Sequence, residues 1–180
     1  NGKTTTMKTI YNILRRWGIN AGYVGTVSVE YGDVILEPTL STPDILYLQN
    51  LYHEMVLAGV TEVCQEVSSQ GLSLRRVDGI RFNDASFTNL THDHLDYHLT
   101  MDAYFEAKKI LFDRLDENAH TIFNIDDAYG QRLFEEDYPH KVSIGIEHPA
   151  DYQAVDIRLG TKDTQFTLIH KGIEYPVQTS

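Results

Sequence analysis

The sequence predicts an α/β fold in which a mainly parallel sheet is flanked by helices, with a small antiparallel β appendage near the C-terminus. Strand patterns alternate with helical patterns over most of the 180 residues, which is typical of βαβ units with parallel strands. About forty residues at the end carry strand patterns separated only by turns. The length suits one domain, so we expect residues 1–180 to form a single domain.

In the first half of the chain, apolar residues spaced by three and four positions predict two helices. The first helix ends before Gly18, and the second begins after Ser41 and Thr42, a pattern typical of an N-cap. Residues 22–36 predict two strands around a glycine turn. The apolar stripes consist of Met7, Ile10, Tyr11, Leu14 and Trp17 in the first helix, and of Leu48, Leu51, Tyr52 and Met55 in the second.

The second half of the chain continues the alternation. A helix is expected at about 100–115, and the pair Asp126-Asp127 opens a shorter one. Strand patterns before and between these helices lie at residues 60–67, 82–89 and 121–125. The antiparallel appendage is expected from residues 141–147, 154–160 and 164–172.

Composition narrows the class of partner. Acidic residues outnumber basic ones by 26 to 15, and the net charge of −11 argues against broad binding to nucleic acid or to an anionic membrane surface. The single cysteine, Cys64, excludes an internal disulfide and a four-thiolate zinc site, and we expect it to be a buried strand residue. No apolar run approaches the roughly 20 residues of a membrane span. We therefore expect a monomeric, cytoplasmic protein.

A phosphate-binding motif opens the chain. Gly2, Lys3 and Thr4 match the closing half of G-x-x-x-x-G-K-[ST] and run directly into the first predicted helix. In such a loop, backbone N–H groups face the phosphates, the lysine neutralises their charge and the hydroxyl ligates Mg²⁺. The first glycine would precede Asn1, so a chance match is the alternative. For the same reason, we expect the isolated 180-residue chain to be inactive.

A second candidate is the cluster of three imidazoles and two carboxylates at residues 92–98 (HDHLDYH). Such a cluster suggests metal or phosphate chemistry. The alternative is a solvated polar loop whose aspartates cap the next helix. A zinc site is less favoured, because neither a cysteine pair nor a helical H-E-x-x-H motif accompanies the cluster.

A lysine interrupts the apolar stripe of the helix expected at 100–115. Lys108 lies in the middle of this stripe, where burying an ammonium is costly unless it is paired or neutralised. The alternative is a buried stem with its head in water. Neighbouring Lys109 is rotated by roughly 100° off the stripe and should face solvent. The stripe consists of Met101, Tyr104, Phe105, Leu111, Phe112 and Leu115.

Glu66 follows a predicted strand, at the place where open α/β sheets bind ligands. Its carboxylate suits Mg²⁺, which prefers oxygen ligands. Arg75 and Arg76 could pair with anionic substrate groups, although surface arginines often have no such role.

Five segments, in this order, resemble the central ATP-binding domain of the Mur ligases, and most closely the tripeptide synthetases that add the third amino acid of the peptidoglycan stem peptide. They extend from Asn1 to about Asp127 and read NGKTTT, STPD, EVSSQGLSLRRVDG, FTNLTHDHLDYH and MDAYFEAKKILF. The resemblance implies the phosphate-loop α/β fold of that domain, cut at both ends, with the family's N- and C-terminal domains outside the chain.

The resemblance also implies two Mg²⁺ sites. Thr4 and Glu66 would hold the ion between the β- and γ-phosphates of ATP. His94 and Lys108 would lie at a second ion, Lys108 being carbamylated by CO₂. Mn²⁺ is an alternative ion at His94, because imidazole is an unusual ligand for a hard cation.

Two further groups of residues would bind the substrates. The nucleotide would be held by Asn1, Gly2, Lys3, Thr4 and Thr5. The catalytic residues would be Lys3, Lys108 and His94. The UDP-MurNAc-peptide would be contacted by Ser41, Thr42, Ser68 and Arg76. The chain departs from residues frequent in the family at Leu40, Ser41, Gln70 and Leu74.

The implied activity is carboxylate activation by ATP. The carboxylate of UDP-MurNAc-L-Ala-D-Glu would become an acyl phosphate, which the amino group of meso-diaminopimelate or L-lysine would attack; these residues do not decide between the two amino acids. The partners would be these small molecules, without nucleic acid or a membrane span. Two alternatives stay open: another ligase of the superfamily such as folylpolyglutamate synthase, and a metal-dependent phosphohydrolase built on the His/Asp cluster.

Overall fold

The computed structural model describes residues 1–93 and 95–179. The chain divides into two compact units, each with its own sheet. Unit 1 comprises residues 1–80 and 92–110, and unit 2 comprises residues 81–91 and the chain from residue 111 onward. Among the described residues, no helix has the length and apolar character that crossing a membrane requires.

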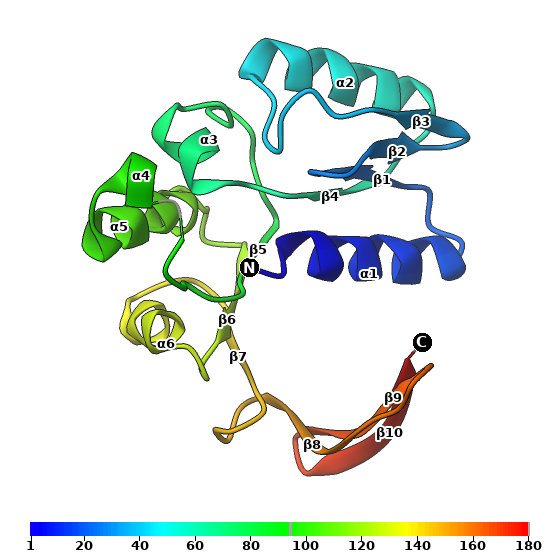
Figure 1. The fold of residues 1–180 in the computed structure, drawn as a ribbon. Helices are drawn as coiled ribbons and strands as arrows, with labels where there is room; N and C mark the ends of the chain where they lie inside the picture. Colours follow the sequence, from blue (N-terminus) through cyan, green and yellow to red (C-terminus); the bar gives the residue numbers. More distant parts are fainter. Residues whose placement is uncertain (94, 180) are drawn as a thin grey trace. The chain divides into compact units, whose positions relative to one another are not determined.

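Unit 1 holds a four-stranded sheet in the order β3-β2-β1-β4, with α1 and α2 on opposite sides of it (Figure 1). β1 pairs in parallel with β4, whereas β2 and β3 add antiparallel strands on the other side of β1. The elements are α1 (Lys3–Arg16), β1 (Ala21–Val24), β2 (Val29–Tyr31), β3 (Val34–Leu36), α2 (Ile45–Leu57), β4 (Glu62–Gln65), α3 (Ser69–Ser73), α4 (Leu95–His98) and nearly all of α5 (Met101–Phe112).

The core of unit 1 forms on both faces of β1, because successive strand residues point to opposite faces of a sheet. Tyr23 packs against Tyr11 of α1, with ring centroids 5.9 Å apart. Its neighbour Gly22 faces α2 on the other side, where an added Cβ would lie 3.0 Å from the Met55 sulfur. All four residues of β1 are buried as a result.

Unit 2 holds a six-stranded sheet in the order β10-β9-β8-β7-β6-β5. β5 to β8 pair in parallel, and β8, β9 and β10 pair in antiparallel fashion. The core is aromatic: Phe123 of β6 is fully buried and lies against Phe112 and Phe134. The elements are β5 (Asp84–Phe87), β6 (His120–Asn124), α6 (Ala128–Glu135), β7 (Lys141–Gly145), β8 (Tyr152–Leu159), β9 (Thr164–His170) and β10 (Ile173–Thr179).

The predicted fold class is confirmed: parallel strands are flanked by helices, and the C-terminal strands are antiparallel. Asp127 caps α6 as the sequence indicates, its side chain accepting from the backbone N–H groups of Tyr129 and Gly130. Two strand predictions differ. Residues 22–36 form three strands, because residues 25–28 close a tight turn, and the strand within 141–147 pairs in parallel with β6.

Two local expectations in unit 1 are wrong. The N-cap of α2 is Asp44, because the Thr42 hydroxyl is engaged by the backbone N–H of Ser68 instead. In the predicted stripe of α1, Ile10 and Trp17 are exposed, Trp17 by 77%, because the buried side of the helix consists of Met7, Tyr11 and Leu14 and extends no further. The stripe of α2 is buried as predicted at Leu48, Leu51 and Met55.

Candidate functional site

The carboxyl ends of the parallel strands β1 and β4 meet at one edge of the sheet in unit 1. Val24 is paired with Gln65, and the backbone N–H of Glu66 donates to the carbonyl of Val24 at 2.9 Å. Helix α1 begins at the same edge. The Thr4 hydroxyl in its first turn donates to Glu66 Oε2 at 2.9 Å. The structure thus brings together the Thr4 hydroxyl and the Glu66 carboxylate, two groups that the sequence predicts as ligands of a metal ion.

The Glu66 side chain is a buried carboxylate, with 2% of the residue exposed. Its Oε1 accepts from the Tyr23 hydroxyl at 2.5 Å and from the backbone N–H of Thr26 at 3.1 Å. Its Oε2 accepts from the Thr4 hydroxyl and, at 3.1 Å, from the Thr26 hydroxyl. These donors offset the desolvation of the charge, which would otherwise be costly. Three of these four bonds come from hydroxyl groups.

The N-terminus of α1 has the local form of an anion site. Gly2 adopts φ 80°, a left-handed conformation that glycine takes without strain, and no side-chain hydrogen bond caps the helix at this residue. The N–H groups of a first helical turn and the helix dipole favour a negative ligand. Lys3 and Thr4 are half-buried there, whereas Asn1, Gly2 and Thr5 are exposed.

A cation lies against the ring of Tyr23. Lys8 Nζ is 4.4 Å from the centroid of this ring and 5.2 Å from that of Tyr11, and it pairs with Glu30. Burial raises the pKa of Tyr23, and the hydrogen bond to Glu66 raises it further. Burial also acts to raise the pKa of Glu30, but hydrogen bonds from Lys8 and Ser28 outweigh it and lower the pKa. Tyr23 is therefore a protonated donor beside a charged pair.

Three of the residues expected to contact the UDP-linked substrate form one cluster. The Thr42 hydroxyl accepts from the backbone N–H of Ser68 at 2.9 Å and lies 3.1 Å from the Ser68 hydroxyl. Arg76 Nη1 donates to the Thr42 carbonyl at 3.1 Å. Thr42 is fully buried and Ser68 caps α3, so both hydroxyls also hold the backbone; Ser41 is half-buried beside them.

Lys108 is half-buried rather than central to a fully buried stripe. Its Nζ lies 5.0 Å from the centroid of the Tyr104 ring, which stacks on His98 at 4.9 Å. His98 is itself buried, with Nε2 2.9 Å from the Ser69 hydroxyl. Burial raises the pKa of Tyr104, and the charge of Asp93 adds to this rise.

Of the remaining candidates, those in the described part of the chain do not converge on one centre. His94 lies outside the described residues, and His92, Asp93 and Asp96 are exposed. Over residues 1–93 and 95–179, no group of three or more His, Cys, Asp or Glu side chains is placed to hold a metal ion. Cys64 is buried as expected, and burial raises the pKa of its thiol to about 11.

Arg75 is exposed and pairs with Asp78 three residues later, at 2.6 Å between Nε and Oδ2. Both partners belong to the short segment that follows α3. Arg75 therefore forms an ordinary surface ion pair, which was the alternative to binding an anionic substrate group.

Sequence reasoning missed Tyr23 and Thr26 as partners of Glu66. The apolar run AGYVG predicts that its tyrosine is a core residue, and the ring of Tyr23 does pack in the core. The signal that would have found it is the register, because β1 runs in parallel beside the strand that precedes Glu66. Register between β1 and β4, whose paired residues (Ala21 with Glu62, for example) lie far apart in the sequence, cannot be read from either strand alone.

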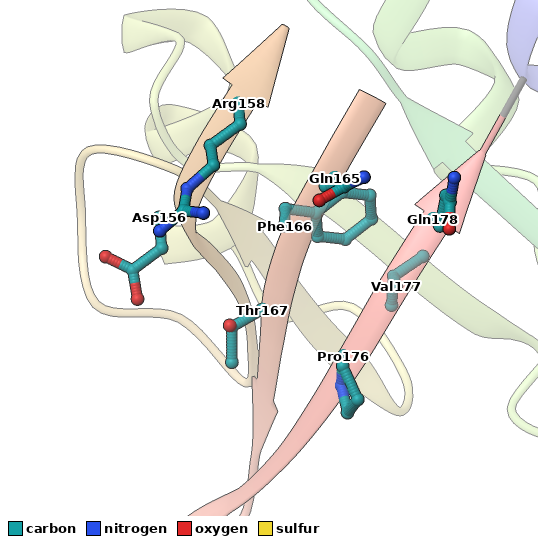
Figure 2. A pocket seen from close by; sticks show the side chains of 8 residues that line it. All are labelled: Asp156, Arg158, Gln165, Phe166, Thr167, Pro176, Val177 and Gln178. Atoms are coloured by element: carbon teal, nitrogen blue, oxygen red, sulfur yellow. The ribbon is translucent and has the colours of Figure 1, made fainter. Parts of the chain in front are cut away.

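A hollow of about 450 Å³ lies elsewhere, on the antiparallel strands β8 to β10 of unit 2. Figure 2 shows Asp156 and Arg158 on one side of it and Gln178 on the other, with Phe166 between them. It contains none of the residues that the sequence analysis proposed for chemistry.

Comparison with known protein families decides the family. The model of the Mur ligase middle domain matches residues 1–180. The chain belongs to this family. Curated relatives of this Mur ligase domain include UDP-N-acetylmuramoyl-L-alanyl-D-glutamate–2,6-diaminopimelate ligase 1 of Clostridium acetobutylicum, 38% identical over 99% of the chain. The ligase of the same name, without the numeral, from Listeria monocytogenes is 40% identical over 93% of the chain. The chain spans 36% and 35% of the lengths of these relatives.

Solved structures agree with the Mur ligase assignment. A UDP-N-acetylmuramoyl-L-alanyl-D-glutamate–2,6-diaminopimelate ligase superposes with a TM-score of 0.85 and 29% identity, over 98% of the chain and 37% of that protein. MurF from Acinetobacter baumannii superposes with a TM-score of 0.71 over 99% of the chain and 36% of that protein. At 18% identity, the second likeness concerns the fold alone.

Proposed function

We propose that this Mur ligase middle domain is the ATP-binding part of a longer, cytoplasmic ligase that adds an amino acid to UDP-MurNAc-L-Ala-D-Glu. The observation that carries the proposal is the Thr4 hydroxyl at 2.9 Å from the buried Glu66 carboxylate, at the N-terminus of α1. The names of the relatives favour 2,6-diaminopimelate over L-lysine as the amino acid. A cytoplasmic location is supported by the supply of ATP and of UDP-linked precursors inside the cell.

The donor set at this edge of unit 1 fits one Mg²⁺ ion. Thr4 and Glu66 offer a hydroxyl and a carboxylate oxygen, the ligands that this hard cation prefers together with phosphate oxygens and water. When bound, the ion would neutralise negative charge on the phosphates. Lys3 and the first N–H groups of α1 would bind and orient the phosphate chain from the other side. Asn1, Gly2 and Thr5 would complete this loop.

The reaction we propose transfers the γ-phosphoryl group to the substrate carboxylate. A carboxylate oxygen forms a bond to γ-phosphorus as the bond to ADP breaks, which gives an acyl phosphate. The amino group of the incoming amino acid then attacks the acyl carbon, and phosphate and a proton leave. Thr42, Ser68 and Arg76 are already linked to one another, so we propose that they present a rigid surface to the UDP-linked substrate, together with Ser41.

We further propose that Lys108 is carbamylated and lies with His94 at a second divalent cation. The carbamate forms when the neutral amine attacks CO₂, making a C–N bond and releasing one proton. The product is an anion on a half-buried side chain, and burying a charge without a compensating partner is costly. Carbamylation should therefore depend on the metal, whose charge stabilises the anionic product.

This proposal is tested on the full-length protein with Lys108→Ala, Lys108→Arg and the control Lys109→Ala. We expect both Lys108 variants to lose nearly all activity, because neither side chain can be carbamylated, and Lys109→Ala to keep most of it. Acetate should restore part of the activity of Lys108→Ala by supplying a carboxylate. Carbon-13 NMR with labelled bicarbonate should give a carbamate signal that requires Mg²⁺. A fully active arginine variant, or the absence of that signal with Mg²⁺ present, would contradict the carbamate.

The ligase itself is tested by measuring ADP release from the full-length protein with the UDP-linked dipeptide. We expect release that requires added meso-diaminopimelate, with L-lysine much less effective. Release without any amino acid would favour the phosphohydrolase, and a requirement for a folate substrate would favour folylpolyglutamate synthase. His92, Asp93 and Asp96 are exposed whereas His98 is buried, so these four side chains do not share one environment, which speaks against the hydrolase.

A further inference from the structure

We infer that Tyr23 is a positioning residue for Glu66: its phenol fixes one oxygen of the carboxylate and so leaves the other, beside Thr4, to face the nucleotide-bound metal. The inference rests on the proposed role of Glu66 as a metal ligand. It adds a residue from β1 to a site otherwise built from the start of α1 and the end of β4.

The two oxygens of Glu66 have partners of different kinds. Oε1 accepts from the Tyr23 hydroxyl at 2.5 Å, within the range of about 2.5–2.7 Å for a charge-assisted O–H···O⁻ bond, and from the backbone N–H of Thr26. Oε2 accepts only side-chain hydroxyls among its described partners, those of Thr4 and Thr26. A threonine hydroxyl can rotate and turn its lone pairs to a cation, whereas a backbone N–H cannot. Oε1 is therefore the anchored oxygen and Oε2 the exchangeable one.

The phenol of Tyr23 is held so that it cannot swing away from Glu66. Tyr23 is fully buried, and its main chain pairs with β2 on one side and with β4 on the other. The ring packs on Tyr11, and Lys8 Nζ lies 4.4 Å from its centroid. Glu30 in turn fixes Lys8 by an ion pair. The hydroxyl is thus placed by a rigid surrounding, as a positioning role requires.

Gly25 gives a second, independent sign that the contact between Tyr23 and Glu66 is built into the chain. A Cβ at this position would lie 2.1 Å from the Tyr23 hydroxyl and 2.2 Å from Glu66 Oε1. The φ of Gly25 is not in the left-handed region, so space rather than backbone conformation requires glycine here. Tyr23 and Gly25 therefore act as a matched pair around the carboxylate.

The decisive experiment is metal binding by Tyr23→Phe in the full-length protein. Manganese EPR with ADP gives the Kd for Mn²⁺, and we expect it to rise about tenfold, the lower end of the range for loss of an outer-sphere partner, because the Thr26 N–H remains. The Mg²⁺ concentration for half-maximal ADP release should rise in parallel, while kcat at saturating Mg²⁺ recovers. A merely structural role would instead lower the Tm of the metal-free protein and leave the Kd unchanged, which would overturn the inference.

Tyr11→Phe is the matched control. Tyr11 is also buried and also lies against Lys8, but the carboxylate that acts on its hydroxyl is Glu30 rather than Glu66, and its charge adds to burial in raising the pKa of Tyr11. We expect its Kd for Mn²⁺ to equal that of the unmodified protein. A rise as large as that of Tyr23→Phe would attribute the effect to packing on Lys8 and would overturn the inference.

Two further variants separate this inference from the proposed function. Glu66→Ala should lose Mn²⁺ binding far more completely than Tyr23→Phe; if it binds Mn²⁺ normally, the metal role of Glu66 fails and this inference fails with it. If Glu66→Ala loses binding but Tyr23→Phe does not, only the role of Tyr23 is wrong. Gly25→Ala should weaken Mn²⁺ binding on its own, because the added Cβ would lie 2.2 Å from Glu66 Oε1 and would displace the carboxylate. Unchanged Mn²⁺ binding by Gly25→Ala would contradict the matched pair.

Discussion

One carboxylate in each unit, Glu66 in unit 1 and Asp126 in unit 2, accepts several hydrogen bonds, but the donors are of different kinds. In unit 1, Glu66 accepts three bonds from side-chain hydroxyls and one from a backbone N–H. In unit 2, Asp126 accepts from three successive backbone N–H groups, those of Ile146, Glu147 and His148, and from the ring of His148. The Glu66 residue is 2% exposed and the Asp126 side chain is 17% exposed, yet only Glu66 is held mostly by partners that can rotate.

The difference separates a carboxylate that holds a loop from one that can bind a ligand. A hydroxyl both donates and accepts and can rotate, so Glu66 can exchange its partners when a cation arrives. A backbone N–H can only donate, and moving it moves the chain. Burial acts to raise the pKa of Asp126, but the hydrogen bonds from the three backbone N–H groups and from the His148 ring outweigh it and lower the pKa. The kind of donor, together with the deeper burial of Glu66, therefore marks the candidate site.

The largest effect expected from this comparison of Glu66 with Asp126 is a loss of turnover when Glu66 is replaced. Glu66→Gln in the full-length protein should slow ADP release by about two orders of magnitude or more, because a neutral amide is a poor metal ligand. Stability should change by less than about 1 kcal/mol, because the surrounding hydroxyls can turn to accept from the amide. Steady-state rates and urea unfolding measure the two effects. Raised Mg²⁺ should recover part of the rate; an unchanged rate would remove Glu66 from the metal site.

Asp126→Asn should show the opposite pattern, with a loss of about 2 kcal/mol in the free energy of unfolding, because its amide would face a backbone N–H. The native pKa of Asp126 is lowered, so its stabilisation is complete above the ordinary aspartate value of about 4 and is lost as the pH falls through the lower native pKa. Urea unfolding should therefore separate variant and parent at pH 7, and the difference should shrink as the pH is lowered below about 4. A constant difference across that range would show that the charge is not involved.

The smallest effect is expected for Asp151→Asn. Asp151 Oδ2 accepts from the backbone N–H of Ser143 at 2.8 Å and from its hydroxyl at 2.7 Å, so it combines the two kinds of donor. One oxygen receives both bonds, and asparagine can offer its carbonyl oxygen in the same place. We expect a loss below about 1 kcal/mol in urea unfolding at pH 7. A loss larger than that of Asp126→Asn would break the proposed order.

Much of the fold could be predicted because periodicity and capping are local properties. The stripe of α2 and the Asp127 cap of α6 follow from residues within a few positions of one another. The failures involve distant partners. Thr42 could not be recognised as a poor cap for α2 without Ser68, and the parallel pairing of β7 depends on β6 rather than on its own residues.

The same distinction explains the site. Thr4 and Glu66 were found because each lies at a recognisable place, a helix start and a strand end, and the structure puts them 2.9 Å apart. The role of Tyr23 could not be predicted, because a tyrosine in an apolar strand gives the same sequence pattern whether or not its hydroxyl donates a hydrogen bond. Only the register of β1 against β4 aligns it with Glu66.

The division of the chain into units has a consequence for the order of folding. Unit 1 is interrupted by residues 81–91, which supply β5 to unit 2, and it is resumed by residues 92–110, which carry His98 and Lys108. On the ribosome, β5 must wait for β6, more than thirty residues later, and unit 1 cannot be completed before residue 110 has emerged. Such non-local closure slows folding and leaves partly formed sheets exposed during synthesis. Neither unit can be excised as one continuous segment, so the two share a single folding history.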